Sequence, residues 1–371
     1  MLDKNKDAFL ALVRAGLWEM DVQLSQYGRI DYNEILRLSE EQSVIGLVTA
    51  GIEHVKDVKL PQNVNLSFAG KALQLEQQNA AMDQFIGVLI DKMRNVGIYT
   101  LLLKGQGLAQ CYERPLWRCC GDVDLFLSEG NYGKAKDFLV PLASSIENEW
   151  ETSKHLGMTV EGWIVEIHGS LRGSLSHRIN SVLNEIRTET FYGGKVRSWI
   201  TNNTQVFLLD INNDVIYVFS HFLNHFYKGG IGLRQICDWC RLLWKYKASL
   251  NYRLLETRLR KMGLMTEWRA FGAFAVDYLG MPADAMPFYV QDVKWKRKAD
   301  RICFFIIEVG NFGHNRDMSY YNEKSYFKRK SISLGRRVKD FMNHARIFPA
   351  DSLRFFPNIL YSGIQSVIRG E

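Results

Sequence analysis

The chain has 371 residues, of which 47% are hydrophobic and 12% aromatic, and its formal net charge is +7. This composition excludes a disordered protein, and the length allows two or three structural units. The best apolar stretch, residues 215–223, is far shorter than the ~20 residues that cross a bilayer, so we expect no transmembrane segment. Charged residues interrupt the first 20 positions, which favours an amphipathic helix over a secretory signal and a cytoplasmic location.

The positive charge is concentrated near the C-terminal end. Residues 291–371 contain 16 Lys and Arg against 8 Asp and Glu. Such a tail attracts nucleic acid, anionic lipid or an acidic partner, and the alternative is a solvated basic face. For residues 331–368 we favour docking on the chain's own helices over contact with lipid, because prolines interrupt the apolar spacing.

Helical periodicity dominates the first 96 residues. Apolar side chains recur at helical spacing over residues 8–24. Asp31 is placed to cap a second helix with Glu34 as its partner in a capping box, and Ser43 is placed to cap a third. Residues 66–96 predict one or two long helices, so we expect a helical N-terminal region.

The periodicity changes after Gly97. Short apolar runs bounded by turn residues predict buried strands, which mark a small α/β unit. The predicted strands cover residues 98–103, 123–127, 157–160 and 163–167, with helices expected just before Tyr112 and over 131–142.

Helical periodicity returns from residue 206 onward. The helix predicted at 233–247 contains Cys237 and Cys240, the one C-x-x-C pair, which we interpret as buried thiols. Residues 319–330 are polar and predict a loop, and residues 331–346 predict a basic amphipathic helix. The other predicted helices cover residues 215–227, 252–261, 266–279 and 292–309.

The segment Gly121-Asp-Val-Asp places two carboxylates on one face of a predicted strand. Residues two apart in a strand point to the same side, so Asp122 and Asp124 project together while Val123 turns into the core. Neighbouring like charges repel, and hard carboxylate oxygens are ligands that divalent cations prefer. We therefore predict that Asp122 and Asp124 bind a metal ion.

Two further segments complete the predicted site. Glu166 alternates with Val165 and Ile167, so it faces away from the core as a third carboxylate and is expected to help deprotonate an acceptor hydroxyl. Lys104 and Gly105 end the first strand, and a glycine there lets backbone N–H groups approach a phosphate. Three carboxylates can hold two Mg²⁺ ions that clamp the attacking and leaving oxygens of phosphoryl transfer.

These motifs occur in the order L-K-G, R-x-x-G-D-V-D and E-x-H. In this order they resemble the uncharacterised bacterial nucleotidyltransferase family, within the polymerase-β-type superfamily. The resemblance covers nearly the whole chain and is closest over residues 85–245. It continues downstream in His155, Glu166, His168, His221, His225, Arg234 and Asp238.

The resemblance implies an α+β fold built on a small mixed-sheet nucleotidyltransferase core. We expect this core at residues 85–200, between an N-terminal helical region at 1–84 and a C-terminal helical domain with a basic tail at 201–371. The active site is expected in the cleft between the sheet and the helices of residues 206–250.

The resemblance also implies a metal-dependent enzyme. It would move a nucleoside monophosphate from an NTP to a hydroxyl acceptor and release pyrophosphate, with Mg²⁺ or Mn²⁺ as cofactor. Its partners are then the NTP, an unidentified hydroxyl acceptor and, through the basic tail, nucleic acid. The implied metal ligands and catalytic residues are Asp122, Asp124 and Glu166, and the implied nucleotide-binding residues are Lys104, Gly105 and Arg118.

One position departs from the wider superfamily, which carries Gly-Ser or Gly-Gly at the turn before the aspartates. Here the turn is Gly105-Gln106, so one hydroxyl donor to phosphate is missing. Lys104, Gly107 or Arg118 would have to replace it. The departure supports an alternative function, a catalytically silent nucleotide-binding or scaffold protein that keeps the fold.

The sequence allows more than one role for several other residues. Arg118 either contacts phosphate or pairs with one of the two aspartates. His221 and His225 share a helix face and are expected to line the cleft or pair with Asp238 rather than to bind zinc. Arg234 is interpreted as the partner of a carboxylate. Packing is favoured over base stacking for Trp117 and Trp163.

Overall fold

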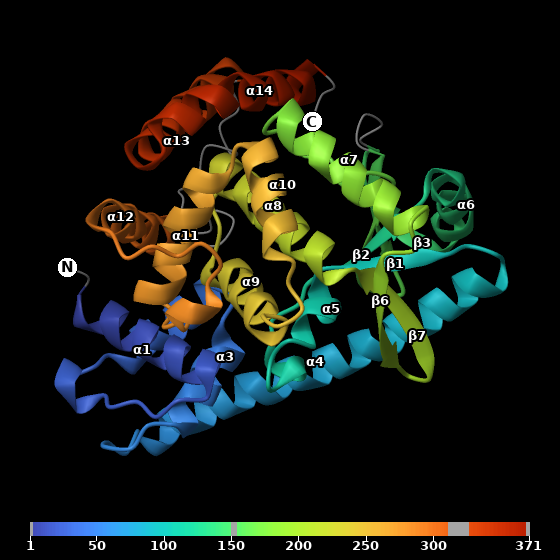
Figure 1. Ribbon diagram of the computed structural model, residues 1–371. Coiled ribbons are helices and arrows are strands. Elements are labelled where there is room, and N and C mark those ends of the chain that lie inside the picture. The colour runs from blue at the N-terminus through green and yellow to red at the C-terminus, as the bar shows by residue number, and fades with distance from the viewer. Residues whose placement is uncertain (1–2, 150–153, 311–325, 369–371) are drawn as a thin grey trace.

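The computed structural model describes residues 3–149, 154–310 and 326–368, and Figure 1 shows the sheet on the right with most of the helices to its left. The expected α+β fold, a mixed sheet flanked by N-terminal and C-terminal helices, is confirmed. Within the described ranges, no helix is long and apolar enough to cross a membrane.

Four helices form the N-terminal part of the chain. The side chain of Asp31 caps the second one by accepting the backbone N–H of Asn33, as the sequence predicts. Glu34 bonds to Arg37 at 2.6 Å instead of forming the expected capping box. Ser43 does not cap the third helix, since it adopts a φ of 53° before that helix begins. The helices are α1 (Lys4–Trp18), α2 (Tyr32–Glu41), α3 (Ile45–Glu53) and α4 (Gln62–Asn95).

The sheet has seven strands in the order β3-β4-β5-β2-β1-β7-β6. The β1–β7 and β2–β5 pairs are parallel, and the remaining pairs are antiparallel. Asp124 of β2 lies opposite Leu103 of β1 on one side and Glu166 of β5 on the other. The strands are β1 (Thr100–Leu103), β2 (Asp122–Leu127), β3 (Ala143–Ile146), β4 (His155–Val160), β5 (Trp163–His168), β6 (Val196–Thr201) and β7 (Thr204–Leu209).

Strands β3, β6 and β7 are not among the predicted elements. β6 lies at an edge of the sheet, where its side chains alternate between exposed and half-buried, so it lacks the apolar run of a central strand. The β6–β7 hairpin turns at Asn202 and Asn203, whose positive φ angles of 46° and 60° suit a two-residue turn. This hairpin extends the sheet beyond residue 200.

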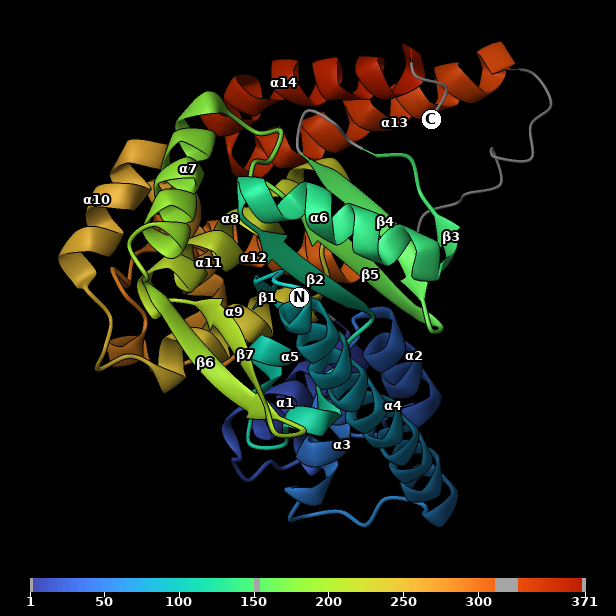
Figure 2. The ribbon, with the colours of Figure 1, turned by 90° about the vertical axis from the view of Figure 1, so that its right-hand side faces the viewer.

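The two faces of the sheet carry different side chains. Helices α4 and α6 (Glu129–Leu139) cover one face, and Figure 2 shows α6 lying across it. Val123 and Leu125 of β2 belong to that core. Alternation along β2 therefore turns Asp122 and Asp124 to the opposite face, toward α8.

The rest of the described chain is helical. Cys237 and Cys240 are buried free thiols in α9, as predicted from the sequence. The helices are α5 (Gly105–Ala109), α7 (His177–Phe191), α8 (Ile211–Lys228), α9 (Leu233–Lys245), α10 (Tyr252–Met262), α11 (Met265–Asp277), α12 (Val293–Val309), α13 (Tyr326–Ile347) and α14 (Pro349–Ile368).

The C-terminal helices pack against the chain's own helices. Phe348 and Phe355 are fully buried, and the Phe348 ring stacks on Phe271 of α11. This packing agrees with the expected docking of the tail. Of the loop predicted at 319–330, residues 319–325 lie outside the described residues and residues 326–330 belong to α13.

A buried carboxyl group lies where the tail meets α8 and α11. Glu267 is fully buried, its Oε1 accepts from the hydroxyl of Tyr227 at 3.3 Å, and its Oε2 has no partner among the described residues. Burial, with the nearby charge of Asp351, raises the pKa of Glu267 to about 8, while Arg354 acts in the opposite direction. Lys298 is a further cation in this neighbourhood.

Because the Glu267 carboxyl is buried, we expect the protein to lose stability at alkaline pH. A raised folded-state pKa means that the folded protein holds a proton that the unfolded chain releases near pH 4.5. The stabilisation is complete below that pH and is lost as the pH rises through about 8. Glu267→Gln should therefore melt at a higher temperature than the parent at pH 9. Calorimetry from pH 5 to 9 measures this, and parallel curves for both proteins would contradict it.

Candidate active site

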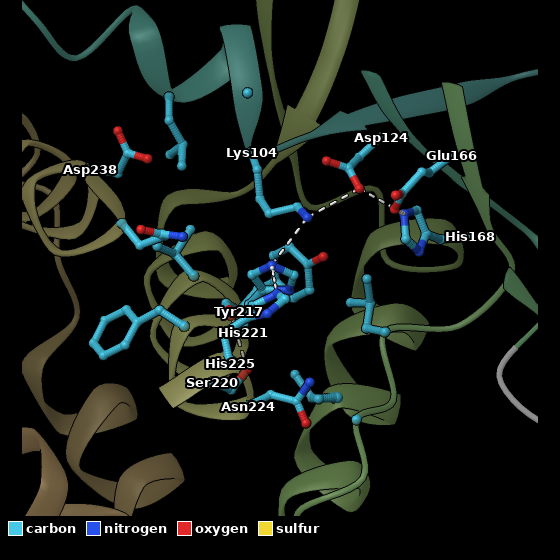
Figure 3. Close-up of a pocket in the computed structure, with 18 of the residues that line it drawn as sticks. Lys104, Asp124, Glu166, His168, Tyr217, Ser220, His221, Asn224, His225 and Asp238 are labelled. Carbon is cyan, nitrogen blue, oxygen red and sulfur yellow. Dashed lines mark hydrogen bonds and ion pairs between the residues drawn. The ribbon is translucent and has the colours of Figure 1, made fainter. Parts of the chain in front are cut away.

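A cavity of about 530 Å³ lies between the sheet and helices α7, α8 and α9. Figure 3 shows the ends of the strands on one side of it and α8 on the other. The cleft is thus in the region that the sequence predicts. All six residues proposed for the site line the cavity: Lys104, Gly105, Arg118, Asp122, Asp124 and Glu166.

Three carboxylates converge on the sheet side of this cavity. Asp122, Asp124 and Glu166 each offer an oxygen, and these atoms lie within 4.8 Å of one another. The convergence follows from the strands, because Asp122 and Asp124 share a face of β2 and Glu166 is in register with Asp124. Asp124 is only 1% exposed, and its Oδ2 has no hydrogen-bond partner among the described residues.

Basic side chains lie against this cluster. Lys104 Nζ lies 3.1 Å from Asp124 Oδ1, and His168 Nε2 lies 2.8 Å from the same oxygen. His155 Nε2 lies 3.0 Å from Glu166 Oε2. Figure 3 shows the Lys104 amine between Asp124 and the ring of His221, whose Nε2 is 3.2 Å from Nζ.

The two aspartates have opposite electrostatic environments. Repulsion by Asp124, together with burial, raises the pKa of Asp122. Burial also opposes ionisation of Asp124, but Lys104 and His168 outweigh it and lower the pKa of that carboxyl. For Glu166, hydrogen bonds from His155 and His168 outweigh burial and hold the pKa well below its usual range. Asp124 and Glu166 are therefore ionised in the folded protein.

Lys104 and Gly105 form a sharp turn between β1 and α5. Both residues have positive φ, 50° and 45° respectively. Glycine adopts this backbone without strain, whereas a lysine there is costly and must be held by its surroundings. The turn directs the Lys104 amine into the cavity, where burial is outweighed by Asp124 and the pKa of the amine lies above its ordinary value.

Gln106 points away from the cavity. Its side chain is 1% exposed, its Nε2 donates to the backbone oxygen of Asn79 at 3.1 Å, and its Oε1 accepts from Cys120 at 3.1 Å. Asn79 in turn donates to the backbone oxygens of Leu116 and Arg118, each at 2.7 Å. Gln106 thus fastens the turn to α4 and offers no polar group to the cavity.

Arg118 pairs with Asp238 rather than with either cavity aspartate. Its Nε and Nη2 donate to the two Asp238 oxygens at 2.8 and 2.6 Å, and both side chains are almost fully buried. The hydroxyl of Tyr112 donates to the same carboxylate at 2.8 Å. Asp238 is therefore not the partner of His221 or His225, which bond to each other at 3.0 Å.

The structure also shows the surroundings of Arg234 and of the two tryptophans, Trp117 and Trp163. Arg234 donates to the backbone oxygen of Cys119 at 2.9 Å and lines the cavity, and its buried Nε has no partner among the described residues. Among the described residues its hydrogen bond is thus to a backbone oxygen, while its charge acts on the cavity carboxyl of Asp122. Trp163 packs against Phe85, and Trp117 donates to Glu76, so neither tryptophan faces the cavity.

A polar stripe on α8 forms the opposite wall. Burial and Lys104 lower the pKa of His221 well below its usual value and that of His225 to about 4, so both rings are neutral at pH 7. Asn224 accepts the backbone N–H of Ser174 at 3.4 Å. The sequence reasoning missed Tyr217, Ser220 and Asn224, although their helical spacing with His221 marks one face of an apolar helix. It also missed Ser170 and Arg172, for which no periodicity gives a signal.

Chemically, the cavity combines an ionised carboxylate cluster, a lysine at a sharp turn and a wall of neutral hydrogen-bonding groups. Carboxylates close together on adjacent strands bind divalent cations, and the lysine attracts phosphate. This combination is suited to holding a divalent cation and a phosphate side by side.

The chain belongs to the family described as uncharacterised nucleotidyltransferases, because the sequence model of that family matches residues 28–280. This confirms the resemblance and supports a transferase of nucleotidyl groups. Neither a curated protein nor a solved structure gives a significant match to the chain.

Proposed function

We propose that the protein transfers a nucleoside monophosphate from an NTP to a hydroxyl acceptor, in a reaction that requires a divalent cation and releases pyrophosphate. The convergence of Asp122, Asp124 and Glu166 beside the Lys104–Gly105 turn is the observation that carries the proposal. Family membership supports nucleotidyl transfer in general.

The donor set fits Mg²⁺ or Mn²⁺. Asp122, Asp124 and Glu166 present three hard oxygens, and the buried Oδ2 of Asp124 lacks a partner among the described residues. A divalent cation bound there would neutralise charge that develops on the transferred phosphoryl group. The low pKa of Glu166 makes it a better cation ligand than a proton acceptor. Of the two roles expected for Glu166, metal ligand and base, we therefore propose that of ligand.

Lys104, Gly105 and Arg118 are proposed to receive the triphosphate. Lys104 Nζ lies 3.1 Å from Asp124 Oδ1, at the edge of the carboxylate cluster. The positive charge of this amine would attract an anionic phosphate beside a cation held by the carboxylates. Arg118 keeps its bond to Asp238 and contributes positive charge at the cavity wall.

The wall formed by α8 is proposed for the acceptor. His221 and Asn224 offer neutral hydrogen-bonding groups across the cavity from the carboxylates. A neutral imidazole nitrogen can accept a hydrogen bond from a hydroxyl, whereas a protonated ring only donates. His221 is therefore the side chain we propose to orient the acceptor hydroxyl.

The proposal is tested by incubating the protein with each α-³²P-labelled NTP, Mg²⁺ or Mn²⁺, and cell extract as the source of acceptor. We expect one labelled product and stoichiometric pyrophosphate with at least one nucleotide. Thermal stabilisation by NTP and cation without any product would favour the silent nucleotide-binding alternative, which the inward-facing Gln106 supports. If the protein shows neither thermal stabilisation nor a labelled product, both proposed functions are overturned.

Glu166→Gln should reduce turnover and cation binding together. The amide keeps the shape of the side chain but loses the charge that His155 and His168 stabilise. We expect turnover to fall about a hundredfold and the Mn²⁺ concentration needed for half-maximal rate to rise. Steady-state kinetics at varied Mn²⁺ measures both quantities. A fall in turnover at an unchanged Mn²⁺ requirement would instead return Glu166 to the role of base.

A further inference from the structure

A second cluster of possible ligands adjoins the three carboxylates. His155 lies on β4, and Glu166 and His168 lie on β5. Each offers one ligand atom, and these atoms lie within 4.8 Å of one another. The cluster shares Glu166 with the carboxylate site, but its other two donors are imidazole nitrogens.

The strands fix the position of both rings. His155 is the register partner of His168, so the two side chains leave the sheet on the same face. Their rings stack with centroids 4.7 Å apart and planes within 26° of parallel. Their Nε2 atoms lie 3.0 and 3.5 Å from the same oxygen, Glu166 Oε2. Two nitrogens and one oxygen thus converge on one region before any cation is added.

The cluster is open to the cavity. The side chains of His155, Glu166 and His168 are 26%, 27% and 14% exposed, and all three line the cavity wall. A cation can therefore reach them from solvent without opening the core. A cluster buried beneath the sheet would not have this access.

The donor chemistry discriminates among cations. Imidazole nitrogen suits Fe²⁺, Co²⁺ and Zn²⁺, and Mn²⁺ accepts both nitrogen and oxygen ligands, whereas Mg²⁺ prefers oxygen ligands and retains its water. Asp122, Asp124 and Glu166 provide only oxygen. The two clusters consequently differ in the class of metal that they favour.

We propose that His155, Glu166 and His168 bind a second divalent cation, of the Mn²⁺ and Co²⁺ class rather than Mg²⁺, with Glu166 shared between the two clusters. Cation binding at this place does not depend on turnover. Only its part in catalysis rests on the proposed function. The competing explanation is that the two imidazoles serve solely as hydrogen-bond partners of Glu166 and Asp124.

The test titrates the full-length protein with Co²⁺ and follows visible absorption and stoichiometry. We expect two Co²⁺ per chain in the parent. His155→Ala should bind one Co²⁺ tightly, with at least a tenfold weaker second site and a weaker visible band. Asp122→Asn should weaken the other site and keep the band that arises from imidazole. His177→Ala, an exposed histidine outside the cavity, should match the parent.

A measurement on the unmodified protein guards against misfolded variants. Pulsed electron paramagnetic resonance of Mn²⁺ bound to the parent should show hyperfine coupling to imidazole ¹⁴N, and excess Mg²⁺ should not abolish it. Absence of this coupling, or identical Co²⁺ spectra for His155→Ala and the parent, would overturn the proposal. Nucleotidyl transfer without ¹⁴N coupling would leave the proposed function standing and remove only this site. If the ¹⁴N coupling is seen without nucleotidyl transfer, the metal site stands and the proposed function does not.

Discussion

Replacing either cavity aspartate by asparagine should abolish metal-dependent transfer, but the two variants should differ in stability. Asp122→Asn and Asp124→Asn each remove a charge from the proposed cation site. We expect turnover to fall at least about a thousandfold, which corresponds to about 4 kcal/mol of barrier. Asp122→Asn should raise the melting temperature, because repulsion by Asp124 raises the pKa of Asp122. Asp124→Asn should lower it, because Lys104 and His168 lose their anionic partner.

Transfer assays and calorimetry at pH 7.5 measure the two effects separately. Asp137→Asn is the matched control, since Asp137 is exposed on α6 and lies outside the cavity. It should leave both rate and melting temperature unchanged. Full activity in either cavity variant would refute the metal site, and equal stability shifts would refute the electrostatic assignment.

Breaking the buried pair between Arg118 and Asp238 should cause a large loss of stability. Asp238→Asn leaves the Arg118 guanidinium buried with no anion, and removal of one partner from such a pair costs about 3–5 kcal/mol. The double variant Arg118→Met with Asp238→Asn removes both charges and keeps an acceptor for Tyr112. We expect it to recover most of the lost free energy of unfolding. Urea denaturation measures these values.

The exposed pair of Arg260 and Glu256 on α10 is the control. Arg260→Met should cost less than about 1 kcal/mol, because an exposed ion pair contributes little.

The double variant Arg118→Met with Asp238→Asn also tests the nucleotide role of Arg118. If it is stable and its NTP affinity equals that of the parent, Arg118 is structural and does not bind the nucleotide.

The site residues whose positions depend on strand alternation could be predicted from the sequence. Asp122 and Asp124 lie on one face because the period of a strand is two, which requires no knowledge of the tertiary structure. That Glu166 joins them depends on the pairing of β5 with β2. The long helices were visible from their helical periodicity, and the central strands β1, β2 and β5 from short apolar runs between turn residues. The β6–β7 hairpin was not recognised, although Asn202 and Asn203 carry its turn signal.

The partners of the charged side chains could not be predicted. Arg118 and Asp238 are 120 positions apart, and Lys104 and His221 are 117 positions apart. Only the packing of α8 and α9 over the sheet brings them together. The sequence reasoning expected repulsion between the two aspartates to dominate. It had no means of placing Lys104 and His168 against Asp124.

Helix α4 is long enough to pack in both hydrophobic cores of the molecule. Phe68 and Leu75, in its first half, belong to the core of the N-terminal and C-terminal helices, and Met82 to Met93, in its second half, belong to the core beneath the sheet. Asn79 lies between them and holds the Gln106 side chain next to the phosphate turn proposed here. A truncation at residue 84 would cut this helix and leave that turn without its anchor. We therefore expect the geometry of the site to depend on residues 1–84, although none of those that the structure describes lines the cavity.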